Sequence, residues 1–262
     1  YGELREYRAE FEYEKGTRYF RQQDYTSAMH VFEKVAGEYE KTRFGPWGHY
    51  YLGKIAESIN KPDDAARKYE SILKQFPQSD VIPRVLLSLG NMHFNAERFD
   101  VAITCFRHIL DAPESAGDIL PYAMSNIIES YESTKLYDAA LKTTRDFIER
   151  FPTDESIIDK KIKIGILYSK LGYYDQAILQ FQNLINEAGS SLEAELRYNI
   201  GEAYYNKGAY QQAILEFLKV PYLVSKQGKV NWTATSFYMA GQAYEKESKF
   251  EEAISMYQQV ID

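Results

Sequence analysis

The sequence is poor in the residues that form catalytic, metal and disulfide sites. Its single cysteine, Cys105, cannot form an intramolecular disulfide. Its four histidines lack the spacing of a helical metal site. The glycines are spread along the chain, and no glycine-rich loop that would bind a phosphate is present. We therefore expect a protein that is not an enzyme and that has no cofactor and no metal.

Long apolar runs and an excess of positive charge are also missing. No apolar segment approaches the roughly 18 residues that cross a bilayer, so membrane contact is expected only through a missing anchor or a partner. The formal net charge of −7 argues against nucleic acid as a partner. Apolar residues make up 45% and charged residues 26% of the 262 residues, which is typical of a folded globular protein.

What the chain has instead is one unit that repeats seven times. An alanine recurs at steps of 36 to 40 residues, and in six units a glycine lies twelve residues before it and an aromatic residue four after it. The fourth unit has Ile128 and Thr144 instead, and we expect looser helix packing there. The period predicts a solenoid. The alanines are Ala28, Ala65, Ala102, Ala140, Ala177, Ala213 and Ala253, and the glycines are Gly16, Gly53, Gly90, Gly165, Gly201 and Gly241.

Each unit predicts two helices joined by a short turn. Apolar residues recur at spacings of three and four, whereas strand signals are absent. The small residues mark the place where the two helices cross. Each turn ends in a residue that is suited to cap the second helix, because its side-chain oxygen can accept from a free N–H group. These predicted caps are Thr26, Asp63, Asp100, Asp138 and Asp175.

The order of glycine, tyrosine, alanine and a second aromatic residue resembles the tetratricopeptide repeat, a helix-turn-helix unit of about 34 residues. Residues 52–77 and 200–220 carry the resemblance best. It implies an all-α fold, a right-handed superhelical solenoid of about seven helix-turn-helix repeats that forms one domain over residues 1–262. The expected repeats are 9–42, 46–79, 83–116, 121–154, 158–191, 194–227 and 234–262.

Tyrosine is abundant, with 23 residues, and most of it can be explained by packing. Nine tyrosines fall three residues after the glycine position or three before the alanine, where a helix pair is packed. They are Tyr19, Tyr25, Tyr131, Tyr137, Tyr168, Tyr174, Tyr204, Tyr210 and Tyr244.

The resemblance also implies a concave groove lined by the first helix of each unit. Aromatic and charged residues there would anchor a peptide or a helix, although the aromatic ones have the alternative of packing against the neighbouring unit. The Lys-Asn pattern of receptors for chaperone tails is missing. The candidate groove residues are Tyr13, Phe20, Tyr50, Lys54, Asn91, Phe94, Glu129, Glu132, Tyr198, Glu202, Tyr205 and Tyr238.

Two connecting segments are irregular. Residues 37–51 carry Trp47 between glycines, and residues 219–238 carry three lysines and Trp232 without an acidic residue. The second segment could bind an acidic partner or a lipid surface, but we favour a long helix connection whose Trp232 packs inward.

We predict a non-catalytic protein–protein interaction scaffold that docks peptide or helix segments in its concave groove. One alternative is a component that assembles complexes of the bacterial envelope. The endings "FPQSD" and "FPTDES" resemble envelope members of the family, such as the outer-membrane β-barrel assembly lipoprotein and the Tol–Pal periplasmic coordinator. That likeness favours a periplasmic or outer-membrane-associated location over a cytoplasmic one. Another alternative is a regulatory or small-molecule-binding solenoid fused to an enzyme.

The chain begins at Tyr1 and stops inside a predicted helix, so we expect a fragment of a longer protein. The last unit would leave an apolar edge around Tyr257 and Val260. We expect this edge to continue in the longer chain or to self-associate.

Overall fold

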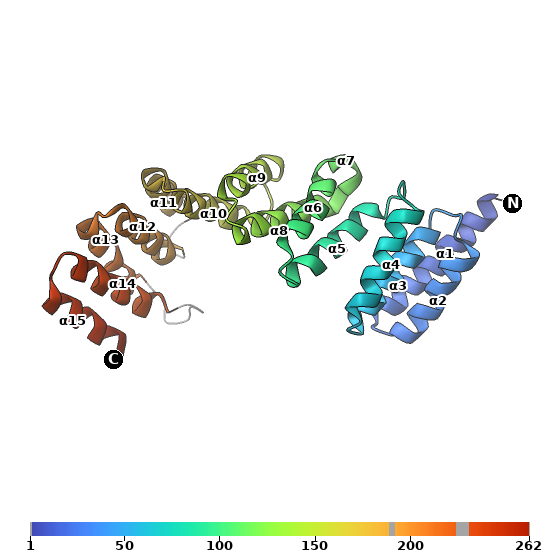
Figure 1. Ribbon diagram of the computed structural model, residues 1–262, viewed down its shortest axis with the longest axis horizontal. Coiled ribbons are helices and arrows are strands. Elements are labelled where there is room, and N and C mark those ends of the chain that lie inside the picture. The colour runs from blue at the N-terminus through green and yellow to red at the C-terminus, as the bar shows by residue number, and fades with distance from the viewer. Residues whose placement is uncertain (1, 189–191, 224–230, 262) are drawn as a thin grey trace. The chain divides into compact units, whose positions relative to one another are not determined.

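The computed structural model describes residues 2–188, 192–223 and 231–261, in which all long elements are α-helices (Figure 1). The predicted all-α fold is therefore confirmed. The long helices are α1 (Gly2–Arg21), α2 (Tyr25–Glu38), α3 (Gly45–Ser58), α4 (Pro62–Gln75), α5 (Ile82–Asn95), α6 (Phe99–Leu110), α8 (Leu120–Ser133), α9 (Tyr137–Arg150), α10 (Ile157–Lys170), α11 (Tyr174–Ala188), α12 (Glu193–Lys207), α13 (Tyr210–Phe217), α14 (Trp232–Lys246) and α15 (Phe250–Ile261). The short elements are α7 (Pro113–Ala116), η1 (Gly117–Ile119) and η2 (Val220–Tyr222).

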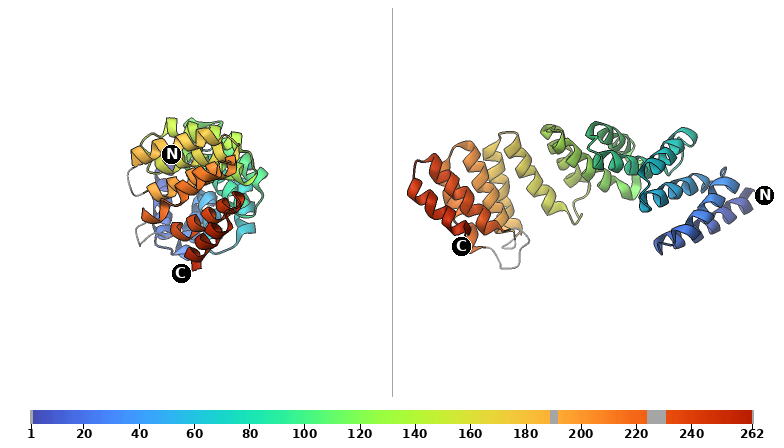
Figure 2. Two further views of the ribbon diagram at one scale, coloured as in Figure 1. Left: turned by 90° about the vertical axis from the view of Figure 1, so that its left-hand side faces the viewer. Right: turned by 60° about the horizontal axis from the view of Figure 1, so that its bottom comes forward.

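The long helices form seven consecutive pairs, one for each predicted repeat, and we call the members of a pair its first and second helix. In the six pairs other than α8 and α9, the two helices are antiparallel neighbours, and second helices also contact the first helix of the next pair, as α4 contacts α5. Helices α1 to α4 stand side by side in this way (Figure 1), as do α12 to α15 (Figure 2). First helices of successive repeats also touch, as α5 and α8 do and as α10 and α12 do.

The helices group into two compact units, Tyr1–Thr134 and Lys135–Asp262. The boundary falls in the turn between α8 and α9, so the fourth repeat contributes one helix to each unit. A single solenoid domain over residues 1–262 stays a prediction.

One residue in each turn between paired helices has a left-handed backbone conformation. In the first turn this residue is Gln23, whose N–H donates to the Phe20 carbonyl at 3.0 Å, while the N–H of Asp24 donates to the Tyr19 carbonyl at 3.0 Å. These bonds satisfy carbonyls at the end of the first helix and reverse the chain. Five of the seven residues are not glycine; the set is Gln23, Asn60, Glu97, Lys135, Gly172, Gly208 and Ser248.

The predicted capping residues were placed two positions too late. Thr26, Asp63, Asp100, Asp138 and Asp175 are each the second residue of their helix, because the helix begins directly after the tight turn. The four aspartates still stabilise the first helical turn through the helix dipole. The caps that the structure shows are Asp24, which accepts from the Ser27 N–H at 3.1 Å, and Asn231, which accepts from the Ala234 N–H at 3.1 Å.

Six of the pairs pack a glycine of the first helix against an aromatic ring of the second. A Cβ atom on Gly90 would lie 2.4 Å from Cε1 of Phe106, a ring that is fully buried. These contacts confirm the predicted role of the small residues at the helix crossing. The equivalent pairs are Gly16–Phe32, Gly53–Tyr69, Gly165–Phe181, Gly201–Phe217 and Gly241–Tyr257.

The fourth repeat reverses the sizes of these two side chains. Ile128 replaces the glycine and Thr144 replaces the aromatic ring, and both are fully buried. The Thr144 hydroxyl satisfies itself by donating to the Ala140 carbonyl at 2.8 Å. The looser packing that we expect in this repeat stays a prediction.

The nine tyrosines assigned to packing are all buried or half-buried, which confirms that assignment. Trp232 begins α14, and its ring lies 5.2 Å from that of Tyr198, so it packs inward as favoured above. Lys226 and Lys229 of the basic segment lie outside the described residues. Trp47 belongs to the first turn of α3.

Candidate functional site

All twelve predicted groove residues lie on first helices. Tyr13 and Phe20 lie on α1, Tyr50 and Lys54 on α3, Asn91 and Phe94 on α5, Glu129 and Glu132 on α8, Tyr198, Glu202 and Tyr205 on α12, and Tyr238 on α14.

Several predicted groove aromatics are held by neighbouring rings. The ring of Tyr13 lies 6.0 Å from Trp47 of the next repeat, and Tyr198 contacts Trp232 of the next repeat. Burial raises the pKa of the phenols of Tyr13 and Tyr198. The alternative of packing against the neighbouring unit therefore describes these two residues. Tyr238 remains 48% exposed although its ring lies 5.8 Å from that of Tyr257.

Helices α5 and α8 enclose a polar pocket of about 280 Å³, which we call the α5–α8 pocket. Asn91, Phe94 and Asn95 line it from α5, and Asn126 and Glu129 line it from α8. The Asn126 side-chain amide donates to Oδ1 of Asn91 at 2.6 Å, so each carboxamide orients the other. The Phe94 ring is braced edge-on by Phe99 at 5.3 Å between centroids.

Helices α10 and α12 enclose a second pocket of about 190 Å³, the α10–α12 pocket. Phe181 of α11 belongs to its lining and is 1% exposed, so the ring is part of the core. The other lining residues are Ile166, Ser169 and Lys170 of α10 and Asn199, Glu202 and Asn206 of α12.

The two pockets have the same register in the repeat. Each takes the residues one, four and five positions after the glycine of one first helix. Each then takes an asparagine and a glutamate from the following first helix, as Asn126 with Glu129 and Asn199 with Glu202. The chain thus presents an Asn-x-x-Glu turn at the same place in both units.

The two glutamates differ in their surroundings. Burial raises the pKa of Glu202, while the hydrogen bond from the Tyr198 hydroxyl at 3.2 Å and the charge of Lys170 act in the opposite direction. Glu129 is exposed and is the only charged residue that lines the α5–α8 pocket. Throughout the described parts of the chain, no cation forms an ion pair with Glu129.

Lys54 forms an ion pair within its own helix. Its Nζ atom lies 2.5 Å from Oε2 of Glu57, one helical turn away. Because the pair is half-buried, the ammonium group is largely neutralised within α3.

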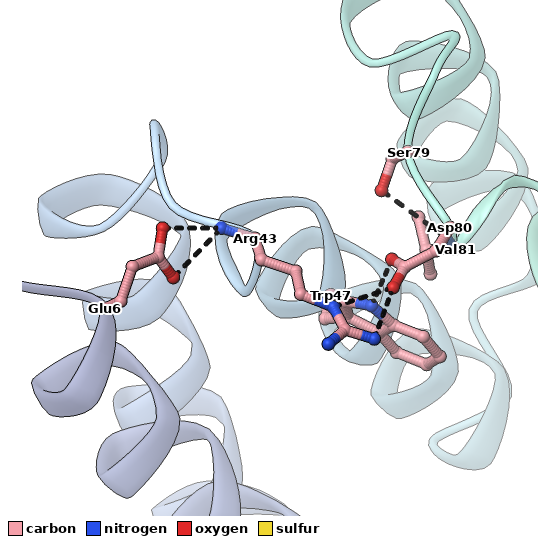
Figure 3. A network of polar contacts seen from close by, with 6 residues as sticks. All are labelled: Glu6, Arg43, Trp47, Ser79, Asp80 and Val81. Carbon is pink, nitrogen blue, oxygen red and sulfur yellow. Dashed lines mark hydrogen bonds and ion pairs between the residues drawn. The ribbon is translucent and has the colours of Figure 1, made fainter. Parts of the chain in front are cut away.

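A polar network links the first three repeats (Figure 3). The backbone N–H of Arg43 donates to the carboxylate of Glu6 at 3.2 Å, and the Arg43 side chain donates to Asp80 at 2.9 Å. Asp80 also accepts from the indole N–H of Trp47 at 2.8 Å. The guanidinium of Arg84 lies 5.8 Å from the centre of the Trp47 ring. The network joins three successive repeats at the start of α3 and α5.

Sequence reasoning missed Asn126 and Asn199, which line the two pockets. Both lie two residues before the glycine position, and the predicted groove positions did not include that place. The available signal was the Asn-x-x-Glu spacing that residues 126–129 share with residues 199–202.

The parts of the chain that the structure describes contain no cluster of three His, Cys, Asp or Glu residues that could hold a metal ion. The same parts contain no helix with the length and apolar character needed to span a bilayer.

Comparisons with known proteins agree with this architecture. At 30% identity over 129 residues, the chain is similar to the general transcriptional corepressor ssn6 of Schizosaccharomyces pombe; the match covers 48% of this chain and 11% of the corepressor. A tetratricopeptide repeat protein from Parabacteroides merdae aligns at a TM-score of 0.58 and 16% identity, over 97% of this chain and 92% of its own. The quorum sensor NprR from B. thuringiensis aligns at a TM-score of 0.63 and 19% identity, over 98% of this chain and 76% of its own. At these identities the two solved structures establish the fold.

The finer likeness to bacterial envelope proteins stays a prediction.

One model of the tetratricopeptide repeat matches residues 13–80, 50–118 and 162–222, and a second matches residues 234–262. Because these matches cover well over half of the chain, it belongs to the tetratricopeptide repeat family.

Proposed function

We propose that the chain is a scaffold that holds extended segments of partner proteins in the α5–α8 and α10–α12 pockets. A role in protein interactions is supported by the family, whose members generally serve as non-catalytic scaffolds. The observation that carries the finer proposal is the shared register, in which carboxamide and carboxylate groups face a pocket between neighbouring first helices in both units.

Carboxamides are suited to hold an extended peptide whatever its sequence. An asparagine side chain offers both donors and an acceptor, so it can pair with the N–H and C=O groups of a peptide backbone. The bond from Asn126 to Asn91 uses one donor and one acceptor and leaves Oδ1 of Asn126 and a donor of Asn91 for a ligand. Side chains that are already oriented lose little entropy on binding.

The comparisons are consistent with this proposal. The matched corepressor shares 30% sequence identity with this chain over 129 residues, and the quorum sensor NprR shares its fold. The quorum sensor was solved in an apo form, which points to a ligand for that protein. By analogy we place a ligand of this chain in the pockets between first helices.

The experiment is a selection from a library of acetylated and amidated decapeptides on the whole chain, followed by fluorescence anisotropy. Asn126→Ala and Asn199→Ala are each expected to lower the affinity for the selected peptides by about tenfold, because each removes hydrogen bonds to the peptide backbone. Asn183→Ala, an exposed residue of α11, is the matched control and should leave affinity unchanged. If all three variants bound the peptides as tightly as the unmodified chain does, the binding surface would lie elsewhere.

A second proposal concerns self-association through α15. Ile254 and Val260 are 58% and 37% exposed, whereas the equivalent Ile214 and Val220 of the preceding repeat are 5% and 0% exposed. A second copy of the chain would bury this apolar face. Sedimentation velocity should then show association that Ile254→Lys abolishes, and a monomer at all concentrations would contradict it.

The envelope and enzyme-fusion alternatives remain separate proposals. The first depends on the Phe-Pro endings at residues 76–77 and 151–152. Fractionation of the native cells tests it, since an envelope component would be found in the envelope fraction and not in the cytoplasmic fraction. Sequencing of the full gene tests the second, because a fused enzyme would appear as an adjoining catalytic domain.

A further inference from the structure

The α5–α8 pocket carries a negative charge that no residue in the described parts of the chain neutralises through an ion pair. The α10–α12 pocket has a glutamate, Glu202, at the equivalent position. Glu202 receives a hydrogen bond from Tyr198 and shares its pocket with Lys170. At the position equivalent to Lys170 the α5–α8 pocket has Asn95, a neutral residue. The two pockets therefore offer different chemistry on the same backbone register.

We propose that the α5–α8 pocket binds an arginine side chain of the docked peptide. This proposal rests on the proposed function, because the arginine belongs to the extended segment that the carboxamides hold. It goes beyond that function by giving one pocket a side-chain preference.

The lining groups match a guanidinium in both charge and shape. The Glu129 carboxylate can accept two parallel N–H bonds, which is the geometry that arginine favours. The carbonyl oxygen of Asn95 can accept from the remaining N–H groups, since its side chain is exposed and lines the same pocket. The half-buried Phe94 ring offers a flat face for the planar group, and Phe99 holds that ring in place.

The preference should be for arginine over lysine. A lysine ammonium is compact and strongly hydrated, so it can satisfy the carboxylate but gains little from a ring face. The volume of about 280 Å³ is also large enough for a long side chain and for a stretch of backbone next to Asn91 and Asn126.

The test compares arginine with citrulline, which has the same shape without the charge. Acetylated and amidated octapeptides of alanine and glycine, with arginine, citrulline, lysine or glutamate at one scanned position, are titrated against the whole chain. At the position that enters the pocket, arginine should bind about tenfold more tightly than citrulline. Glu129→Gln should reduce that ratio to about twofold or less, and high salt should reduce it in the unmodified chain.

Two further variants make the result specific. Glu33→Gln removes the same charge from an exposed site on α2 and should keep the tenfold ratio. Phe94→Leu should lower arginine binding by about threefold while citrulline changes less. Circular dichroism confirms that each variant is folded.

The outcomes separate this inference from the proposed function. Equal binding of arginine and citrulline at every position, or a ratio that Glu129→Gln leaves unchanged, overturns the arginine preference. If such peptides still depend on Asn126, the scaffold function stands without it. If no peptide binds, both proposals fail.

Discussion

The close contact between Gly90 and Phe106 makes a quantitative prediction about stability. In Gly90→Ala the new Cβ atom would lie 2.4 Å from a ring carbon, whereas carbon atoms pack at about 3.5 Å. The ring must move by about 1 Å, and it has no free space because it is fully buried. Overpacking of this kind costs about 3 kcal/mol, and alanine returns about 1 kcal/mol through its helix propensity. We expect a net loss of about 2 kcal/mol in the free energy of unfolding.

The chain contains a matched control for this substitution. Gly37 also lies in a helix, but a Cβ atom there would meet nothing within 4 Å. Gly37→Ala should therefore stabilise the chain by up to about 1 kcal/mol through propensity alone. The two alanine substitutions are expected to change the free energy of unfolding in opposite directions. Urea unfolding followed by circular dichroism measures both changes.

A second substitution tests the cause. The fourth repeat combines a large residue, Ile128, with a small one, Thr144, at the corresponding positions. The double variant Gly90→Ala/Phe106→Leu should accordingly lose less unfolding free energy than the two single variants lose together, by at least about 1 kcal/mol. Stabilisation by Gly90→Ala, or strict additivity in the double variant, would refute the reasoning.

Three further predictions concern turns, networks and pH. Glu97→Gly should stabilise the chain by about 0.5–1 kcal/mol in urea unfolding, because the left-handed conformation at φ 57° is costly for glutamate. Asp80→Asn should destabilise it by about 1 kcal/mol and shift Trp47 fluorescence, with a smaller loss in high salt because the Arg43 pair is exposed. The raised pKa of Glu202 means that the native state binds its proton more tightly than the unfolded chain, so its contribution to stability falls as pH rises above about 4.5. Glu202→Gln should remove that slope in unfolding measured across this range.

The repeat register could be predicted from the sequence because one physical constraint recurs in it. A glycine is needed wherever a ring of the second helix crosses the first, so Gly53 and Gly165 identify their partners Tyr69 and Phe181 by spacing alone. The faces of the first helices follow from the same register. This is why four of the predicted groove residues line the pockets, namely Asn91, Phe94, Glu129 and Glu202.

Other features could not be predicted because they depend on local backbone geometry or on contacts between repeats. A left-handed residue such as Gln23 or Lys135 carries no sequence signal, since glycine is the residue that usually marks this conformation. That omission displaced the predicted caps. The pairing of Asn126 with Asn91 joins side chains 35 residues apart, and no spacing within one repeat reveals it.

Photo-crosslinking tests the central claim most directly. Decapeptides selected on the whole chain would carry one photoreactive residue, and the crosslinked positions would be mapped by mass spectrometry. Our account predicts adducts on the first helices α5, α8, α10 and α12, with loss of these adducts in the Asn126→Ala/Asn199→Ala double variant. Adducts that concentrate on the second helices α4, α6 and α11, unchanged in the double variant, would contradict it.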